Sequence, residues 1–135
     1  MPILINIDVP AIEPAVAFYT RGLGLTVGRR MGSDFVELLG ADAPIYLLKK
    51  DAGTTPFPAA PHPRTYARHW SPVHLDFVVD DIEAALQRAR AAGATVEDEI
   101  SEHAYGRLAL LADPFGNGFC LLQLTGRGYD AITTG

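Results

Sequence analysis

The chain has 135 residues, of which 48% are hydrophobic and 20% charged, and its formal net charge is −5. This composition indicates a globular domain with a core of its own and excludes a disordered chain. The 11 Lys and Arg residues are scattered, so we expect no binding of nucleic acid or of a membrane surface. A lone cysteine, no signal-peptide pattern at the N-terminus and no apolar run of about 20 residues favour a cytoplasmic protein.

Residues 1–49 are predicted to form a first module. Apolar and β-branched residues indicate a strand at 3–9, and helical spacing follows near 12–22. Pro14 is compatible with that helix only in its first turn. Further strands are expected near 25–30, 34–39 and 44–49. Residues 50–70 contain four prolines, which predicts a linker whose aromatic residues pack onto another part of the protein.

Residues 71–125 are predicted to form a second module with the same order of elements. A strand at 73–79 precedes Asp80 and Glu83, which have the spacing of a helix capping box. An apolar stripe then begins at Ile82, and Gly93 is expected to end the helix. Strands follow near 95–100, 107–112 and 119–124, the last two joined by the turn DPFGNG. Residues 126–135 are expected to be a loose tail or an oligomer contact.

An internal repeat supports this division into modules. At an offset of 70 residues, four residues of the first module recur in the second. The matching residues are Val9, Ile12, Glu13 and Ala15 in the first module and Val79, Ile82, Glu83 and Ala85 in the second. The repeat predicts two similar units within one domain.

The leading strand of each module is apolar on one side and partly polar on the other. Alternation separates Ile3, Ile5, Ile7 and Val9 from Asn6 and Asp8, and Val73, Leu75, Phe77 and Val79 from His74 and Asp76. We expect the apolar sides to face the helices. The polar sides then face either water or a cleft, and their recurrence in both modules favours a cleft.

Three segments resemble one known group of proteins: VPAIEPAVAFYTRGLGL, HLDFVVDDIEAALQRARAAGA and YGRLALLADPFGNGFCLLQL. They are similar to the vicinal oxygen chelate (VOC) superfamily, which includes glyoxalase I, extradiol dioxygenases and the bleomycin-resistance and fosfomycin-resistance proteins. The resemblance implies an α+β fold of two βαβββ modules whose sheets form an open curved barrel around a cleft. It does not specify an activity, because the superfamily contains both enzymes and binding proteins.

The resemblance also implies where a metal would bind. The four ligand positions of the superfamily fall on Leu4, Tyr46, His74 and Cys120, and among these His74 alone is a typical ligand for an open site of His and carboxylate. We therefore expect no cofactor, with a divalent metal at His74 as the alternative. Asp76 lies two residues further on the same face, about 7 Å along the strand, which is too far for a direct pair in many rotamers.

The expected function is binding of a small organic molecule in the cleft without a metal. The residues expected to line that cleft are Asn6, Asp8, Tyr46, Trp70, His74, Asp76 and Cys120. One alternative is a metal-dependent lyase, isomerase or dioxygenase that uses His74, and another is a structural dimer whose cleft is filled by side chains. A homodimer is expected because single modules leave sheet edges exposed. The roles of His62 and His69 stay open.

Overall fold

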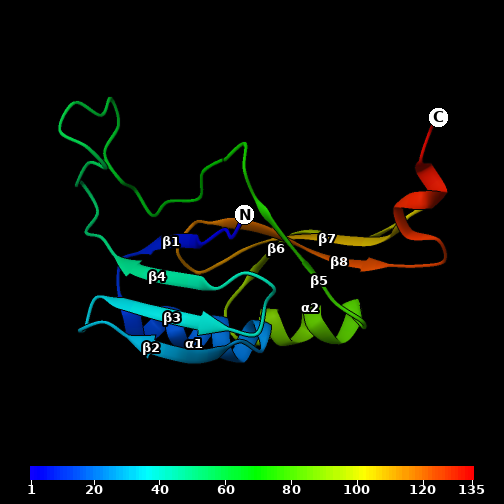
Figure 1. Ribbon diagram of the computed structural model, residues 1–135, viewed down its shortest axis with the longest axis horizontal. Helices are drawn as coiled ribbons and strands as arrows, with labels where there is room; N and C mark the ends of the chain where they lie inside the picture. The colour runs from blue at the N-terminus through cyan, green and yellow to red at the C-terminus, as the bar shows by residue number, and fades with distance from the viewer. The chain divides into compact units, whose positions relative to one another are not determined.

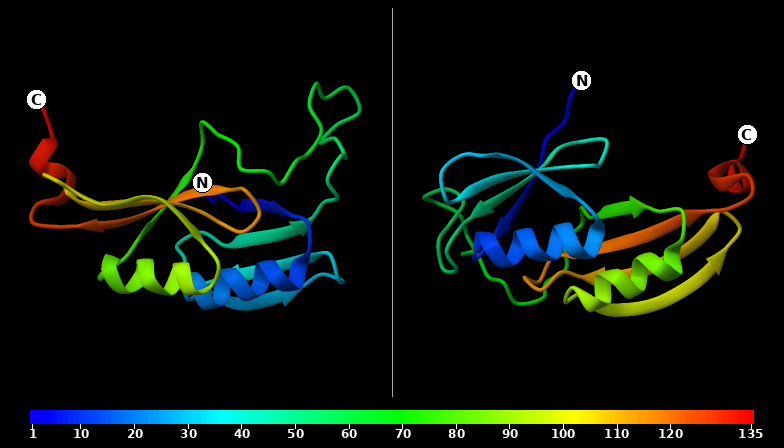
Figure 2. Two further views of the ribbon diagram at one scale, coloured as in Figure 1. Left: turned by 180° about the vertical axis from the view of Figure 1, so that it is seen from behind. Right: turned by 90° about the horizontal axis from the view of Figure 1, so that it is seen from below.

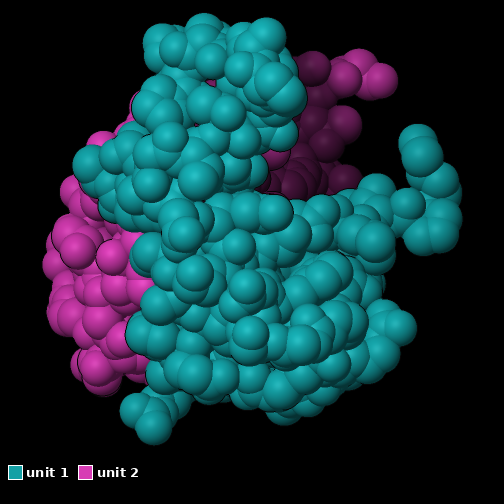
Figure 3. Space-filling view, turned by 90° about the vertical axis from the view of Figure 1, so that its left-hand side faces the viewer, with its two compact units in different colours: residues 1–67 teal, residues 68–135 magenta.

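Two βαβββ modules follow one another along the chain in the computed structural model, which describes residues 1–135 (Figure 1). They form separate units, Met1–Ala67 and Arg68–Gly135, which Figure 3 distinguishes by colour. Each unit contains one mixed four-stranded sheet and one α-helix. The predicted α+β fold of two βαβββ modules is therefore confirmed, whereas the barrel and the cleft between the sheets stay predictions.

The first unit has a sheet in the order β1-β4-β3-β2. Its elements are β1 (Ile5–Val9), α1 (Ile12–Leu23), β2 (Thr26–Arg30), β3 (Phe35–Leu39) and β4 (Ile45–Lys49). β1 runs parallel to β4, and the other pairs are antiparallel. The helix α1 packs on β4, β3 and β2 and covers one face of the sheet (Figure 2). It ends where predicted, because Gly24 adopts the left-handed conformation with φ 72°.

The second unit repeats this arrangement with the order β5-β8-β7-β6. Its elements are β5 (Leu75–Val78), α2 (Ile82–Ala91), β6 (Thr95–His103), β7 (Gly106–Ala112), β8 (Gly118–Leu124) and a short 3-10 helix (Gly128–Ile132). α2 packs on β8, β7 and β6. The tail after residue 125 therefore contains a helical turn that was not predicted. None of the helices has the length and the apolar character needed to cross a membrane.

The capping residue of α2 differs from the prediction by one position. The side chain of Asp81, not of Asp80, accepts a hydrogen bond from the backbone N–H of Ala84 at 3.1 Å. Asp81 is the residue with extended φ and ψ directly before the helix, and only that position directs a side chain at the first-turn amides. Gly93 follows the helix with φ 115°, as expected for a residue that ends it.

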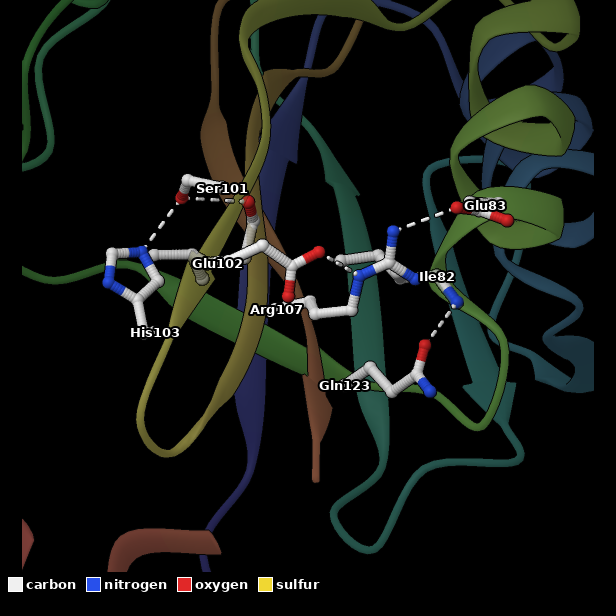
Figure 4. Close-up of polar contacts among 8 residues, drawn as sticks. Ile82, Glu83, Ser101, Glu102, His103, Arg107 and Gln123 are labelled. Atoms are coloured by element: carbon white, nitrogen blue, oxygen red, sulfur yellow. Dashed lines mark hydrogen bonds and ion pairs between the residues drawn. The ribbon is translucent and has the colours of Figure 1, made fainter. Parts of the chain in front are cut away.

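Side chains from three strands and a helix terminus tie the second unit together (Figure 4). Gln123 of β8 accepts a hydrogen bond from the backbone N–H of Ile82 at 3.0 Å. Arg107 of β7 contacts Glu83 of α2 at 2.8 Å and Glu102 of β6 at 2.9 Å. These contacts hold the start of α2 against the sheet.

The core of each unit lies between the helix and the three strands beneath it. Val36, Leu38, Ile45 and Leu47 are buried in the first unit, and Ala109, Leu111 and Leu121 are buried in the second. The leading strands β1 and β5 are instead the edge strands of their sheets. The prediction that their apolar sides are fully packed is wrong. Val9 is buried, but Ile3 and Val73 are exposed, and Ile5, Ile7, Leu75 and Phe77 are only half-buried. An edge strand has a neighbour on one side only, and both helices pack mainly on the other three strands.

The proline-rich segment contains no strand, as predicted, and residues 50–67 fold back within the first unit. Gly53 donates a backbone hydrogen bond to Arg64 at 2.9 Å, and Arg64 donates one to Thr54 at 2.7 Å. The Tyr66 hydroxyl donates to the carbonyl of Lys50 at 2.6 Å. Polar contacts therefore order this segment in place of a sheet ladder.

Candidate functional site

One row of side chains crosses the sheet of the second unit on the face that α2 leaves uncovered. Asp76 of β5 is paired with Cys120 of β8, and Cys120 is paired with Leu110 of β7. Leu111 and Leu121, one residue away along their strands, point to the opposite, helix-covered face. The alternation that buries those leucines therefore places Asp76, Cys120 and Leu110 side by side.

His74 joins this row just before β5 begins. Its Nε2 lies 3.2 Å from Oδ1 of Asp76. The strand spacing was expected to prevent a direct pair in many rotamers, and the structure has a pair of rotamers in which the two side chains meet. One ligand atom each of His74, Asp76 and Cys120 lies within 4.8 Å of the others.

Cys120 is a buried thiol with 8% of its surface exposed. Burial, followed by the neighbouring Asp76 carboxylate, raises the pKa of the thiol to about 11. Both causes disfavour the thiolate. At neutral pH Cys120 is therefore protonated and is a poor nucleophile.

A cavity of about 190 Å³ opens at this row of residues. Leu110 supplies an apolar side chain, and Ser71, His74 and Cys120 supply polar atoms. Trp70, the only tryptophan of the chain, also lines the cavity and is 81% exposed. Of the residues predicted to bind a ligand, the structure thus places Trp70, His74 and Cys120 on one cavity, with Asp76 in contact with His74.

Arg68 and Glu97 form a wall of the same cavity that sequence reasoning missed. The Arg68 guanidinium contacts both carboxylate oxygens of Glu97, at 2.6 and 2.8 Å, and also the carbonyl of His69. The hydrogen bonds raise the pKa of Arg68 and lower the pKa of Glu97. Gly118 leaves room for this pair, since a Cβ atom there would lie 2.5 Å from Nη2 of Arg68. No local pattern could have linked residues 29 positions apart in sequence.

The first unit carries its own polar group on the uncovered face of its sheet. Tyr46 is paired with both Asn6 and Glu37, and its hydroxyl donates to Oε2 of Glu37 at 2.9 Å. Arg29 contacts the same oxygen at 2.7 Å. Glu37 is only 6% exposed, and the hydrogen bonds from Arg29 lower the pKa of Glu37 to about 2. Arg29 and Glu37 were not predicted, although an acidic residue within the apolar strand FVELL is a recognisable signal.

Asp8 is engaged with the proline-rich segment. Its Oδ2 lies 2.8 Å from Nε of Arg64, and this ion pair joins β1 to residues 50–67. The predicted ligand-binding residues therefore divide between the two units, with Asn6, Asp8 and Tyr46 in the first. Convergence of the two groups on one ligand stays a prediction.

Two of the four metal-ligand positions implied by the superfamily are unsuited to a metal in this chain. Leu4 has no ligand atom, and the Tyr46 hydroxyl is bound to Glu37 and Arg29. His74 and Cys120 are the two remaining positions, and two protein ligands are fewer than metal sites use. The four-position metal site of the superfamily is therefore not formed by these residues.

The comparisons with known proteins agree with this fold. The model of a glyoxalase-like domain family matches residues 4–122, and the chain belongs to that family and to the VOC superfamily. The resemblance seen in the sequence is thereby confirmed. The fold is also similar to the solved structure of a lactoylglutathione lyase from Agrobacterium tumefaciens. That comparison has a TM-score of 0.61 and 18% identity, and it covers 91% of this chain and 92% of that one.

Two curated relatives are longer than this chain. The putative glyoxylase CFP32 of Mycobacterium tuberculosis is 33% identical over 113 residues, which are 81% of this chain and 38% of that protein. The anthracycline biosynthesis protein DnrV of Streptomyces peucetius is 39% identical over 67 residues, which are 50% of this chain and 23% of that protein. The chain therefore spans well under half the length of either relative.

Proposed function

We propose that this chain binds a small organic molecule of about one aromatic ring in the cavity of the second unit. The observation that carries the proposal is the cavity itself, about 190 Å³ with an apolar surface beside polar groups. An apolar cavity of about 150 Å³ accommodates benzene, so this volume suits one ring with a polar substituent. The relatives named as a glyoxylase and as an anthracycline biosynthesis protein also favour a small-molecule ligand.

The lining residues indicate how such a ligand is held. Leu110 offers an apolar surface to one part of the ring, and Trp70 offers an exposed aromatic face for stacking. Ser71 and His74 offer hydrogen-bonding groups for a hydroxyl, carbonyl or carboxylate. The charge of Arg68 is already offset by Glu97, so the proposed binding does not depend on a charged ligand. Binding of this kind uses side chains alone and requires no metal.

Trp70 makes the proposal directly testable. As the only tryptophan, it reports ligand binding through its own fluorescence. The protein is titrated with single-ring aromatic compounds that carry a hydroxyl, carbonyl or carboxylate group, and we expect saturable quenching by at least one subclass. Leu110→Phe should abolish that binding by filling the cavity. Leu124→Phe is the matched control, because Leu124 is 41% exposed and does not line the cavity.

Two results contradict the proposal. One is the absence of saturable quenching by any compound of the panel. The other is equal affinity of the wild type and Leu110→Phe, which would place the ligand elsewhere. Calorimetric titration of Trp70→Phe separates loss of the fluorescence signal from loss of binding.

A second candidate function is acid–base catalysis on the bound molecule. The 3.2 Å contact between His74 and Asp76 favours it, since a carboxylate beside an imidazole orients it as a general base. The reaction named by the lactoylglutathione lyase structure is the first to assay, as formation or breakdown of lactoylglutathione. Turnover that is lost in both His74→Gln and Asp76→Asn would favour an enzyme. Ligand binding without turnover of any bound compound would favour a binding protein.

A further inference from the structure

Three potential metal ligands lie together in the second unit, at one edge of its sheet. His74 precedes the edge strand β5, Asp76 lies within it, and Cys120 lies on the adjacent strand β8. Their ligand atoms are all within 4.8 Å of one another. Asp76 is the central member, in contact with His74 at 3.2 Å and paired in register with Cys120.

We propose that His74, Asp76 and Cys120 form a zinc-binding site that lies entirely within the second unit. An imidazole nitrogen, a carboxylate oxygen and a thiolate sulfur are the three ligand types that zinc takes in proteins. The set differs from the four positions of the superfamily, because it includes Asp76 and no residue of the first unit. Asp76 is also the third ligand, and the lack of a third ligand was the reason not to predict a metal from the sequence.

The geometry requires only small side-chain movements. Zinc binds nitrogen and oxygen at about 2.0–2.2 Å and sulfur at about 2.3 Å, so tetrahedral ligands lie roughly 3.5 Å apart. The contact between His74 and Asp76 already has that length, and the largest separation in the set must shorten by about 1 Å. His74 is 55% and Asp76 35% exposed at the side chain, so both have room to rotate.

The site would leave one zinc position for water or for another molecule. Two of the three ligands, His74 and Cys120, line the cavity described above. Three protein ligands with an open fourth position are the arrangement of reactive zinc sites, whereas structural sites have four protein ligands. On binding, the Zn–S bond forms as the Cys120 thiol releases its proton to the solvent.

A thiolate ligand favours zinc over magnesium or calcium, which take oxygen ligands. The rival explanation is that the three side chains satisfy one another, through the His74–Asp76 contact and a weak hydrogen bond between Cys120 and Asp76. The two explanations differ in one measurable respect, because only a metal site gives a metal–thiolate bond.

Cobalt is the probe that makes this bond visible. The full chain, stripped of metal by a chelator, is titrated with Co²⁺ without any organic ligand, so the result does not depend on the proposed function. We expect a saturable thiolate-to-cobalt charge-transfer absorption at equimolar Co²⁺, and its displacement by Zn²⁺. Affinity for Zn²⁺ is then measured by competition with a chromogenic chelator.

Variants decide which side chains bind the ion. Cys120→Ser should abolish the charge-transfer absorption. His74→Ala and Asp76→Asn should each weaken Zn²⁺ binding by at least about tenfold, the lower end of what even outer-shell changes cause. His103→Ala is the matched control, because His103 is an exposed histidine of the same unit that contacts Ser101 at 2.7 Å and lies outside the cluster. Its Zn²⁺ affinity should equal that of the wild type, and circular dichroism confirms folding of each variant.

Three results overturn the proposal. The first is no charge-transfer absorption in the wild type, a result that involves no variant and therefore no doubt about folding. The second is unchanged Zn²⁺ affinity in Asp76→Asn. The third is a loss of affinity in His103→Ala as large as that in His74→Ala, which would indicate nonspecific binding to surface histidines.

Discussion

Leu121 and Leu110 provide a sharp test of which face of the second sheet is core and which is cavity. Leu121 on β8 is 0% exposed and faces α2, whereas Leu110 on β7 is 37% exposed and lines the cavity. Leu121→Ala removes fully buried carbon atoms and leaves a void, at a cost of about 2–5 kcal/mol in the free energy of unfolding. Leu110→Ala removes a partly solvent-exposed side chain without creating an enclosed void, so we expect the free energy of unfolding to fall by only about 1 kcal/mol.

The assay is urea denaturation followed by far-ultraviolet circular dichroism, with the slope of the transition compared among variants. In a domain of this size, each kcal/mol of destabilisation lowers the melting temperature by roughly 3–6 °C. The melting temperatures of the two variants should therefore also differ clearly. His74→Ala and Asp76→Ala serve as further controls on the cavity face, and each should cost no more than about 1 kcal/mol. If Leu110→Ala, His74→Ala or Asp76→Ala destabilises the protein as much as Leu121→Ala, the uncovered face is structural and the site is assigned wrongly.

Three further predictions concern pH, thiol reactivity and assembly. The folded-state pKa of Glu37 is about 2, below its ordinary value of 4.5, so its stabilising contribution is complete above about pH 4.5 and is lost as the pH falls towards 2. Glu37→Gln should therefore flatten the acid limb of a stability–pH curve, and an unchanged limb would contradict the role of Arg29. Cys120 should react slowly with iodoacetamide at neutral pH. It should react faster in Asp76→Asn, because loss of the carboxylate lowers the raised pKa of the thiol. Equal rates in the two proteins would show that burial alone raises that pKa. A homodimer is expected from the open sheet edges at β1, β2, β5 and β6, and sedimentation of a monomer at micromolar concentrations would refute it.

Periodicity was sufficient to predict most elements of this fold. Both helices begin at an isoleucine, Ile12 or Ile82, that opens an apolar stripe, and each is followed by a glycine with positive φ. The turn DPFGNG was predicted from the same kind of local chemistry. Asp113 accepts backbone hydrogen bonds from Phe115 and Asn117 at 2.8 and 2.9 Å, an interaction that spans only four residues.

The leading strands show where a local pattern is insufficient. Alternation correctly placed Asn6, His74 and Asp76 on the polar side of their strands, but it could not show that both strands lie at sheet edges. The predicted strands therefore began two residues too early, and their apolar sides were judged too deeply buried. Edge position depends on which strands pair, and that is decided by contacts between residues far apart in sequence.

The sequence by itself determined the two βαβββ modules, the family and half of the candidate site, because periodicity and turn chemistry act between neighbouring residues. Only the tertiary structure could bring Arg68 to Glu97, Arg29 to Glu37 and Cys120 to Asp76. Each of these pairs joins different strands or a loop and a strand, and the Cys120–Asp76 pair depends on strand register. A shift of one residue in that register would turn Cys120 towards α2 and expose Leu121, so burial of the leucine is what holds the cysteine beside the carboxylate.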